Sequence, residues 1–103
     1  MYKAWQGALN HFPRLTRYTL GSKIDLLFCD VLENILLAAY SPRNEKFSFL
    51  RQANMKFDAL KFFLTMAWEL KYIETKKFGA LSAPLSEVGK MLGKWMLSVK
   101  EHS

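Results

Sequence analysis

The side chains that most often bind metals or act as nucleophiles are few in this chain of 103 residues. His11 and His102 stand near opposite ends, and Cys29 is the single cysteine. A zinc site needs several Cys, His or carboxylate ligands at short spacings, and a cysteine nucleophile needs a base beside it. We therefore predict no metal, no cofactor and no enzymatic activity, and we interpret Cys29 as a packed thiol.

Basic side chains are the one chemically informative group in the sequence. Fifteen Lys and Arg against nine Asp and Glu give a net charge of +6 and a pI near 9.6. That balance favours polyanionic partners such as nucleic acid, although ordinary solubility explains the charge alone equally well. The candidates for phosphate contacts are Arg14, Arg17, Lys76, Lys90 and Lys94.

The three lysines of this set would share one helix face. At helical spacing, Lys76, Lys90 and Lys94 project within about 40° of one another. Such side chains bind phosphates without reading the base sequence. An ordinary solvated face is the alternative, and it is favoured for three lysines taken alone. Symmetric copies in an oligomer would multiply the charge and could join small patches into one basic surface.

The elements that would position these residues are helices, and the central one covers residues 20–40. Its apolar residues fill one broad arc, but more lie on nearly the opposite side, so that we expect it to be buried on two sides. The main arc contains Leu20, Ile24, Leu27, Phe28, Val31, Leu32, Ile35, Ala38 and Ala39.

Helical periodicity predicts three further helices, over residues 2–10, 42–70 and 75–99. Thr19, Ser41 and Thr75 offer hydroxyls that could cap the N-termini of the last three of the four helices. Pro84 should kink or split the last helix, and we expect Gly89 and Gly93 to mark a close contact between helices. With no alternating strand pattern, the fold class is all-α, a single antiparallel four-helix bundle over residues 1–103.

Apolar residues outside the main helix faces predict an oligomer. Half of the chain is hydrophobic and 15% is aromatic, which is more than a domain of this size can bury. One set lies on residues 20–40 and a second repeats at i, i+4, i+7 and i+11 on residues 42–70. We assign to a subunit interface the residues Leu26, Leu37, Met55, Ala59, Phe62 and Met66.

The chain carries no feature of a secreted or membrane protein. A single cysteine allows no intrachain disulfide, and the first residues lack the charged start and apolar core of a signal peptide. The helix over residues 20–40 is too charged to cross a membrane. We therefore expect a cytoplasmic protein with no membrane partner.

Three segments resemble a known family. They are Phe12–Gly21 (FPRLTRYTLG), followed by a long apolar helix that ends in Ala-Ala-Tyr, then Lys56–Lys61 (KFDALK) and Glu87–Trp95 (EVGKMLGKW). All three are similar to the Avd family, the accessory variability determinants of diversity-generating retroelements. The resemblance covers nearly the whole chain. Relatives of that family are four-helix-bundle proteins encoded in 23S rRNA intervening sequences.

The resemblance implies a four-helix bundle that assembles as a ring-like homopentamer with a basic surface. Such a protein binds RNA or DNA and the retroelement's reverse transcriptase, and it supports mutagenic copying of template RNA. By position, Arg14 and Arg17 match basic residues of the family's first connector, and Lys90 and Lys94 fall in its last helix. The alternative is a bundle of the intervening-sequence type that acts as a scaffold without a retroelement role.

Overall fold

The computed structural model describes residues 2–101, and of Glu101 only the backbone. All regular structure in this range is helical and no strand is present. The helices are α1 (Tyr2–Leu9), the single turn α2 (Arg14–Thr16), the π-helical turn η1 (Arg17–Gly21), α3 (Ser22–Tyr40), α4 (Arg43–Glu69) and α5 (Thr75–Glu101). The all-α prediction is therefore confirmed.

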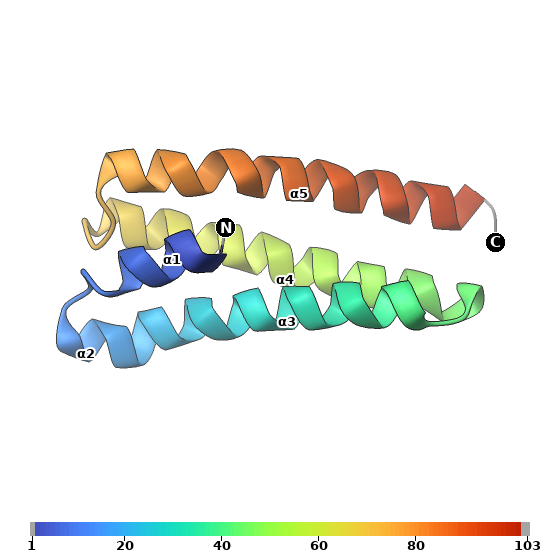
Figure 1. The fold of residues 1–103 in the computed structure, drawn as a ribbon, viewed down its shortest axis with the longest axis horizontal. Coiled ribbons are helices and arrows are strands. Elements are labelled where there is room, and N and C mark those ends of the chain that lie inside the picture. Colours follow the sequence, from blue (N-terminus) through green and yellow to red (C-terminus); the bar gives the residue numbers. More distant parts are fainter. Residues whose placement is uncertain (1, 102–103) are drawn as a thin grey trace.

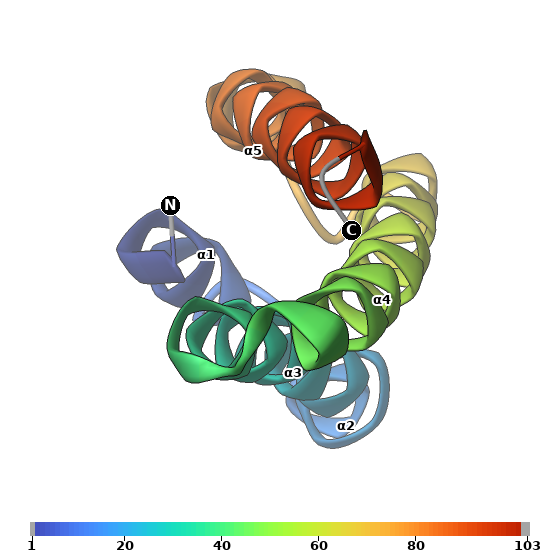
Figure 2. The same cartoon turned by 90° about the vertical axis from the view of Figure 1, so that its right-hand side faces the viewer.

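The three long helices lie side by side, and the short α1 lies beside the first part of α3 (Figures 1 and 2). Between α3 and α4, the ammonium group of Lys56 lies 3.7 Å from the carboxylate of Asp30. Nearer the start of α3, the ammonium of Lys23 lies 5.9 Å from the ring centre of Phe63. The chain therefore runs along α4 in the direction opposite to α3, and it reverses at Ser41–Pro42.

Apolar side chains from every long helix and from α1 form one core. Trp5 and Ala8 of α1 are buried, and the Trp5 ring is stacked on that of Phe28 of α3. Of the predicted main arc of α3, Ile24, Leu27, Phe28, Val31 and Ala38 are buried. The largest fully buried side chains are Trp5, Ile24, Phe28, Leu50, Phe57, Leu60, Leu64 and Leu81.

The second half of α3 is less covered than its sequence predicts. α1 begins at Tyr2, whose ring lies edge-on to Phe28, so α3 continues beyond it (Figure 1). Leu32 and Ala39, which we assigned to the buried arc, are exposed, and Ile35 is half-buried. The prediction was wrong at these positions because an eight-residue helix cannot cover a partner of nineteen residues.

The segment before α3 is helical, whereas the sequence predicted a connector with Thr19 as a cap. The helical backbone begins directly after Pro13, whose extended ψ of 147° is typical of the residue before a helix. It continues through η1 into α3, so Thr19 lies inside a helix. The Thr19 hydroxyl donates instead to the carbonyl oxygens of Leu15 and Thr16, both at 3.3 Å.

The two other predicted caps were also wrong. The hydroxyl of Ser41 donates to the carbonyl oxygen of Leu37 in α3, and no side chain caps the start of α4. The hydroxyl of Thr75 accepts a hydrogen bond of 3.1 Å from the indole nitrogen of Trp68. Ser41 thus bonds back to the carbonyl four residues earlier, whereas Thr75 bonds across the turn to a side chain of the preceding helix.

α5 runs unbroken through Pro84, so the predicted split does not occur. Proline leaves the carbonyl four residues earlier without its usual partner, and that residue, Ala80, is exposed to water. The close contact predicted for the two glycines is present at one of them. A Cβ at Gly89 would lie 2.9 Å from the Phe57 ring, whereas one at Gly93 would have no neighbour within 4 Å.

Candidate nucleic-acid interface

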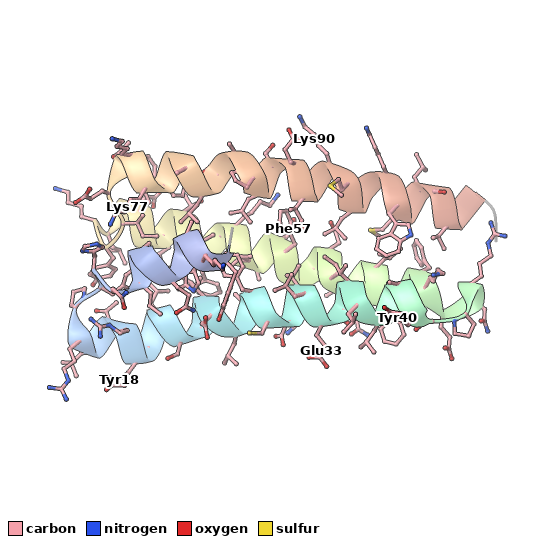
Figure 3. The ribbon with its side chains drawn as sticks, viewed as in Figure 1. Tyr18, Glu33, Tyr40, Phe57, Lys77 and Lys90 are labelled. Carbon is pink, nitrogen blue, oxygen red and sulfur yellow. The ribbon has the colours of Figure 1, made fainter. Side chains whose placement is uncertain are left out.

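The outer side of α5 presents lysines to solvent. Its inner side is occupied by Leu81, Leu85 and Leu92, which are buried against the rest of the bundle. The remaining positions face outward, and the predicted Lys76, Lys90 and Lys94 are all exposed (Lys90 is labelled in Figure 3). α5 as a whole carries five lysines and two glutamates. This helix is therefore the most strongly basic long element of the chain.

The two candidate arginines lie elsewhere on the molecule. Arg14 and Arg17 belong to α2 and η1, and α2 lies on the opposite side of the bundle from α5 (Figures 1 and 2). Arg14 is exposed. One chain therefore does not bring the five candidate basic residues together on a single surface.

Arg17 also has a structural role. One of its guanidinium nitrogens donates to the carbonyl oxygens of Asn10 and Phe12, at 3.2 and 3.3 Å. Asn10 and Phe12 both lie between α1 and α2, so this contact closes the turn that joins the two helices. The guanidinium remains exposed, and its contacts leave part of its donor set for a phosphate.

A groove of about 420 Å³ between α4 and α5 brings one further basic group, Lys61, to the same surface as Lys90. Lys61 of α4 and Lys90 of α5 both line it, together with the ring of Phe57. Lys61 is not among the binding residues predicted from the sequence. The available signal was the polar stripe at Asn54, Asp58, Lys61 and Thr65, whose spacing places all four on one side of a helix.

The described part of the chain offers little other site chemistry. Among residues 2–101 no group of three or more His, Cys, Asp or Glu side chains could hold a metal ion. Cys29 is free and exposed, so its prediction as a packed thiol was wrong. It lies one helical turn after Asp25 on α3, near the hydroxyl of Tyr2 of α1. The second histidine, His102, falls outside the described residues.

Asp25 of α3 is the best-bonded carboxylate of the structure. It accepts hydrogen bonds from the hydroxyl of Tyr2 and from the side-chain nitrogens of Gln6 and Trp5, at 2.5, 2.9 and 3.4 Å. The hydrogen bond to Asp25, with a smaller effect of burial, raises the pKa of Tyr2 to about 12. All three donors belong to α1, so this cluster attaches α1 to α3 and has no separate site role.

A family model that describes bAvd-like proteins matches residues 1–99. The chain belongs to the bAvd-like family. Comparison with curated proteins and with solved structures gives no match. The suspected resemblance to Avd proteins is thus confirmed at the level of the family.

Much of the first motif of this bAvd-like chain has a packing role. Phe12 is buried, with its ring 5.6 Å from that of Trp5 and edge-on to it. Gly21 is buried against α1, where an added Cβ would lie 2.5 Å from Cδ1 of Leu9. Together with the contacts of Arg17, these features shape the corner between α1 and α3. Arg14 and Tyr18, by contrast, are exposed and free for other contacts.

The predicted interface residues of this bAvd-like chain lie on the outer side of the α3–α4 pair. Leu26, Met55 and Phe62 are each about 60% exposed. Lys23 and Asp30 of α3 meet Phe63 and Lys56 of α4, and helical spacing places the predicted residues beyond these contacts, away from the core. Of the remaining three, Leu37 is also exposed, whereas Ala59 and Met66 are half-buried.

A second apolar surface lies between α3 and α5. A groove of about 310 Å³ there is lined by Ile35, Val88, Met91, Leu92 and Trp95. It borders the part of α3 that α1 leaves uncovered, and neither its position nor its lining followed from the sequence. No helix among residues 2–101 is long and apolar enough to cross a membrane.

Proposed function

We propose that this protein is a non-enzymatic accessory subunit of a diversity-generating retroelement. In this role it binds nucleic acid and a reverse transcriptase and supports mutagenic copying of template RNA. The family match over residues 1–99 supports the retroelement context, and the row of exposed lysines on α5 carries the proposal of nucleic-acid binding. The fold we propose is an antiparallel four-helix bundle that assembles as a ring-like homopentamer.

Phosphate contacts are the mode of binding that the α5 surface favours. Lys90 and Lys94 are one turn apart and exposed, and neither forms an ion pair within residues 2–101. Free ammonium groups at that spacing can neutralise neighbouring phosphates. No bidentate arrangement of Arg, Asn or Gln lies on the outer side of α5, so base-specific readout in a groove of a duplex is not expected.

Assembly would enlarge the basic surface. One chain places its candidate lysines and arginines on opposite sides, so a continuous basic surface requires that copies bring α5 of one subunit near α2 of another. The exposed apolar face of the α3–α4 pair supports such association, because a patch of this kind usually marks an interface. In a closed ring every subunit makes the same contact, so the apolar face of the α3–α4 pair would be covered in every copy.

The test is nucleic-acid binding by a double variant, Lys90→Glu with Lys94→Glu. We expect it to bind labelled RNA or DNA several-fold or more weakly than the parent while the helix content stays unchanged. Lys3→Glu with Lys23→Glu changes the net charge equally at exposed sites on α1 and α3, and should weaken binding less. For the parent protein, log affinity should fall linearly with log salt, by roughly 0.7–0.9 per phosphate contacted.

Each outcome of this test leads to a definite conclusion. If both double variants weaken binding equally, only net charge matters and the α5 surface is not the site. If the α5 variant binds normally, Arg14 and Arg17 become the candidate binding site instead of α5. Failure of the parent protein to bind any nucleic acid would favour the scaffold of the 23S rRNA intervening-sequence type and remove the proposed role.

A further inference from the structure

The groove between α4 and α5 has an apolar floor and a polar rim. Its floor is formed by the side chains of Phe57, Leu64, Phe78 and Leu85, which are buried or half-buried. Its volume of about 420 Å³ lies in the range of small-molecule sites. The rim consists of Asn54, Asp58, Lys61, Thr65, Ser82, Ser86 and Lys90. A floor of this kind with a few polar groups above it is typical of a small-molecule site.

Several polar groups of the rim have unused hydrogen-bonding capacity. The amide of half-buried Asn54 has no hydrogen-bond partner within residues 2–101, and neither does the hydroxyl of Ser86. The hydroxyl of Ser82 donates to the carbonyl of Phe78, and this leaves its oxygen free to accept. The groove thus offers both donors and acceptors, which is what the edge of a nucleobase requires.

The charge of the rim is positive. Lys61 lies 3.5 Å from Asp58 and 5.1 Å from the ring centre of Phe57, so its ammonium is held above the apolar floor. Lys90 stands on the other side, on α5, with no ion pair in the described structure. Two lysines against one aspartate leave an excess positive charge at the entrance. That excess fits the phosphate attached to a bound base.

We propose that this groove receives one unpaired nucleotide of a bound single strand. The base lies against the apolar floor beside Phe57, its polar edge meets Asn54 and Ser86, and the adjoining phosphates lie near Lys61 and Lys90. This inference rests on the proposed binding of nucleic acid and adds a preference to it. A base in a duplex is stacked and paired, so it enters such a groove only at the cost of leaving the helix, whereas an unpaired base enters freely.

The test compares a labelled single strand with a duplex of the same sequence, bound to the full chain. Asn54→Leu removes the amide at nearly constant volume, and Ser86→Leu adds an apolar side chain at the mouth of the groove. We expect each variant to lose about fivefold or more in affinity for the single strand, as for loss of a base contact, and to bind the duplex as the parent does. The matched controls are Asn44→Leu and Ser98→Leu, at exposed sites outside the groove.

The results separate this inference from the proposed function. The proposed nucleotide site is wrong if both groove variants bind the single strand as the parent does. It is also wrong if each variant loses equal affinity for the single strand and for the duplex. In either case the proposed function stands if Lys90→Glu with Lys94→Glu still weakens binding. Adenosine monophosphate provides a further arm. If it binds the groove while the single strand does not depend on Asn54, the ligand is a free nucleotide and the proposal fails.

Discussion

A Cβ atom added at Gly89 of α5 would lie only 2.9 Å from Cε2 of Phe57 on α4. The two helices therefore meet through bare backbone on one side and an aromatic ring on the other. Phe57 is 1% exposed and cannot swing into solvent. This contact lies in the wall of the groove between α4 and α5. It also determines how closely the two helices approach.

We predict opposite effects of alanine at the two glycines of α5. Gly89→Ala forces Cβ into the Phe57 ring, and overpacking of about 1–3 kcal/mol exceeds the gain of up to about 1 kcal/mol in helix propensity. Gly93→Ala has open space around its Cβ and should keep that gain. Urea unfolding should therefore show a loss of stability at position 89 and an increase at position 93. An increase at both would mean that the Phe57 ring shifts without cost.

The hydrogen bond from Tyr2 to Asp25 should make stability depend on alkaline pH. The pKa of Tyr2 is raised from 10.0 to about 12 in the folded chain, mainly by that bond. A raised pKa means that the contribution is complete below pH 10 and is lost as pH rises through about 12. Tyr2→Phe keeps the ring against Phe28 but removes the hydroxyl.

Below pH 10, the Tyr2→Phe variant should be less stable than the parent by about 1 kcal/mol. Between pH 10 and pH 12 the difference should shrink, because the parent loses its hydrogen bond and the variant has none to lose. Thermal unfolding of both proteins over this range measures the difference, and effects of pH that the two proteins share cancel in it. A difference that stays constant through pH 12 would contradict the assigned bond.

Oligomerisation should depend on the outer face of the α3–α4 pair. Phe62→Glu places a charge on that face, and Phe62 contributes little to the core of one subunit because it is 60% exposed. We expect a parent pentamer by sedimentation equilibrium and a dissociated variant that keeps most of its helix content. Leu97→Glu, at a similarly exposed site on α5, is the control and should leave the assembly intact. A monomeric parent protein at micromolar concentration would contradict the prediction.

Association with a reverse transcriptase should not rely on simple charge attraction. This chain carries a net charge of +6, and nucleic-acid polymerases of this kind are usually basic, so the two proteins repel at long range. The contact should therefore use apolar or hydrogen-bonded surface, or be bridged by RNA. Co-purification across a salt series, with and without ribonuclease, distinguishes these cases. No co-purification under any condition, and no polymerase gene nearby, would remove the retroelement role while the fold remains.

The sequence by itself determined the helical class and most limits of the long helices to within about two residues, but it missed the helical backbone from Arg14 to Gly21 that precedes α3. Those features are local, because apolar spacing identifies a helix and residues such as Pro13 and Pro42 interrupt or start one. The sequence also identified the exposed lysines of α5, since a residue opposite an apolar stripe faces solvent. The family could be recognised from the sequence because each of its three segments is continuous in the chain.

Only the tertiary structure decided which neighbour each of these residues meets. The Thr75 hydroxyl could cap α5 or meet a side chain of α4, and local sequence does not choose between the two. The exposure of Cys29 and Leu32 depends on how far α1 extends along α3 and on which side stays open. The groove likewise required that a polar stripe on α4 lie opposite Gly89 on α5. Such a pairing depends on how two distant segments pack, and no periodicity within either segment encodes it.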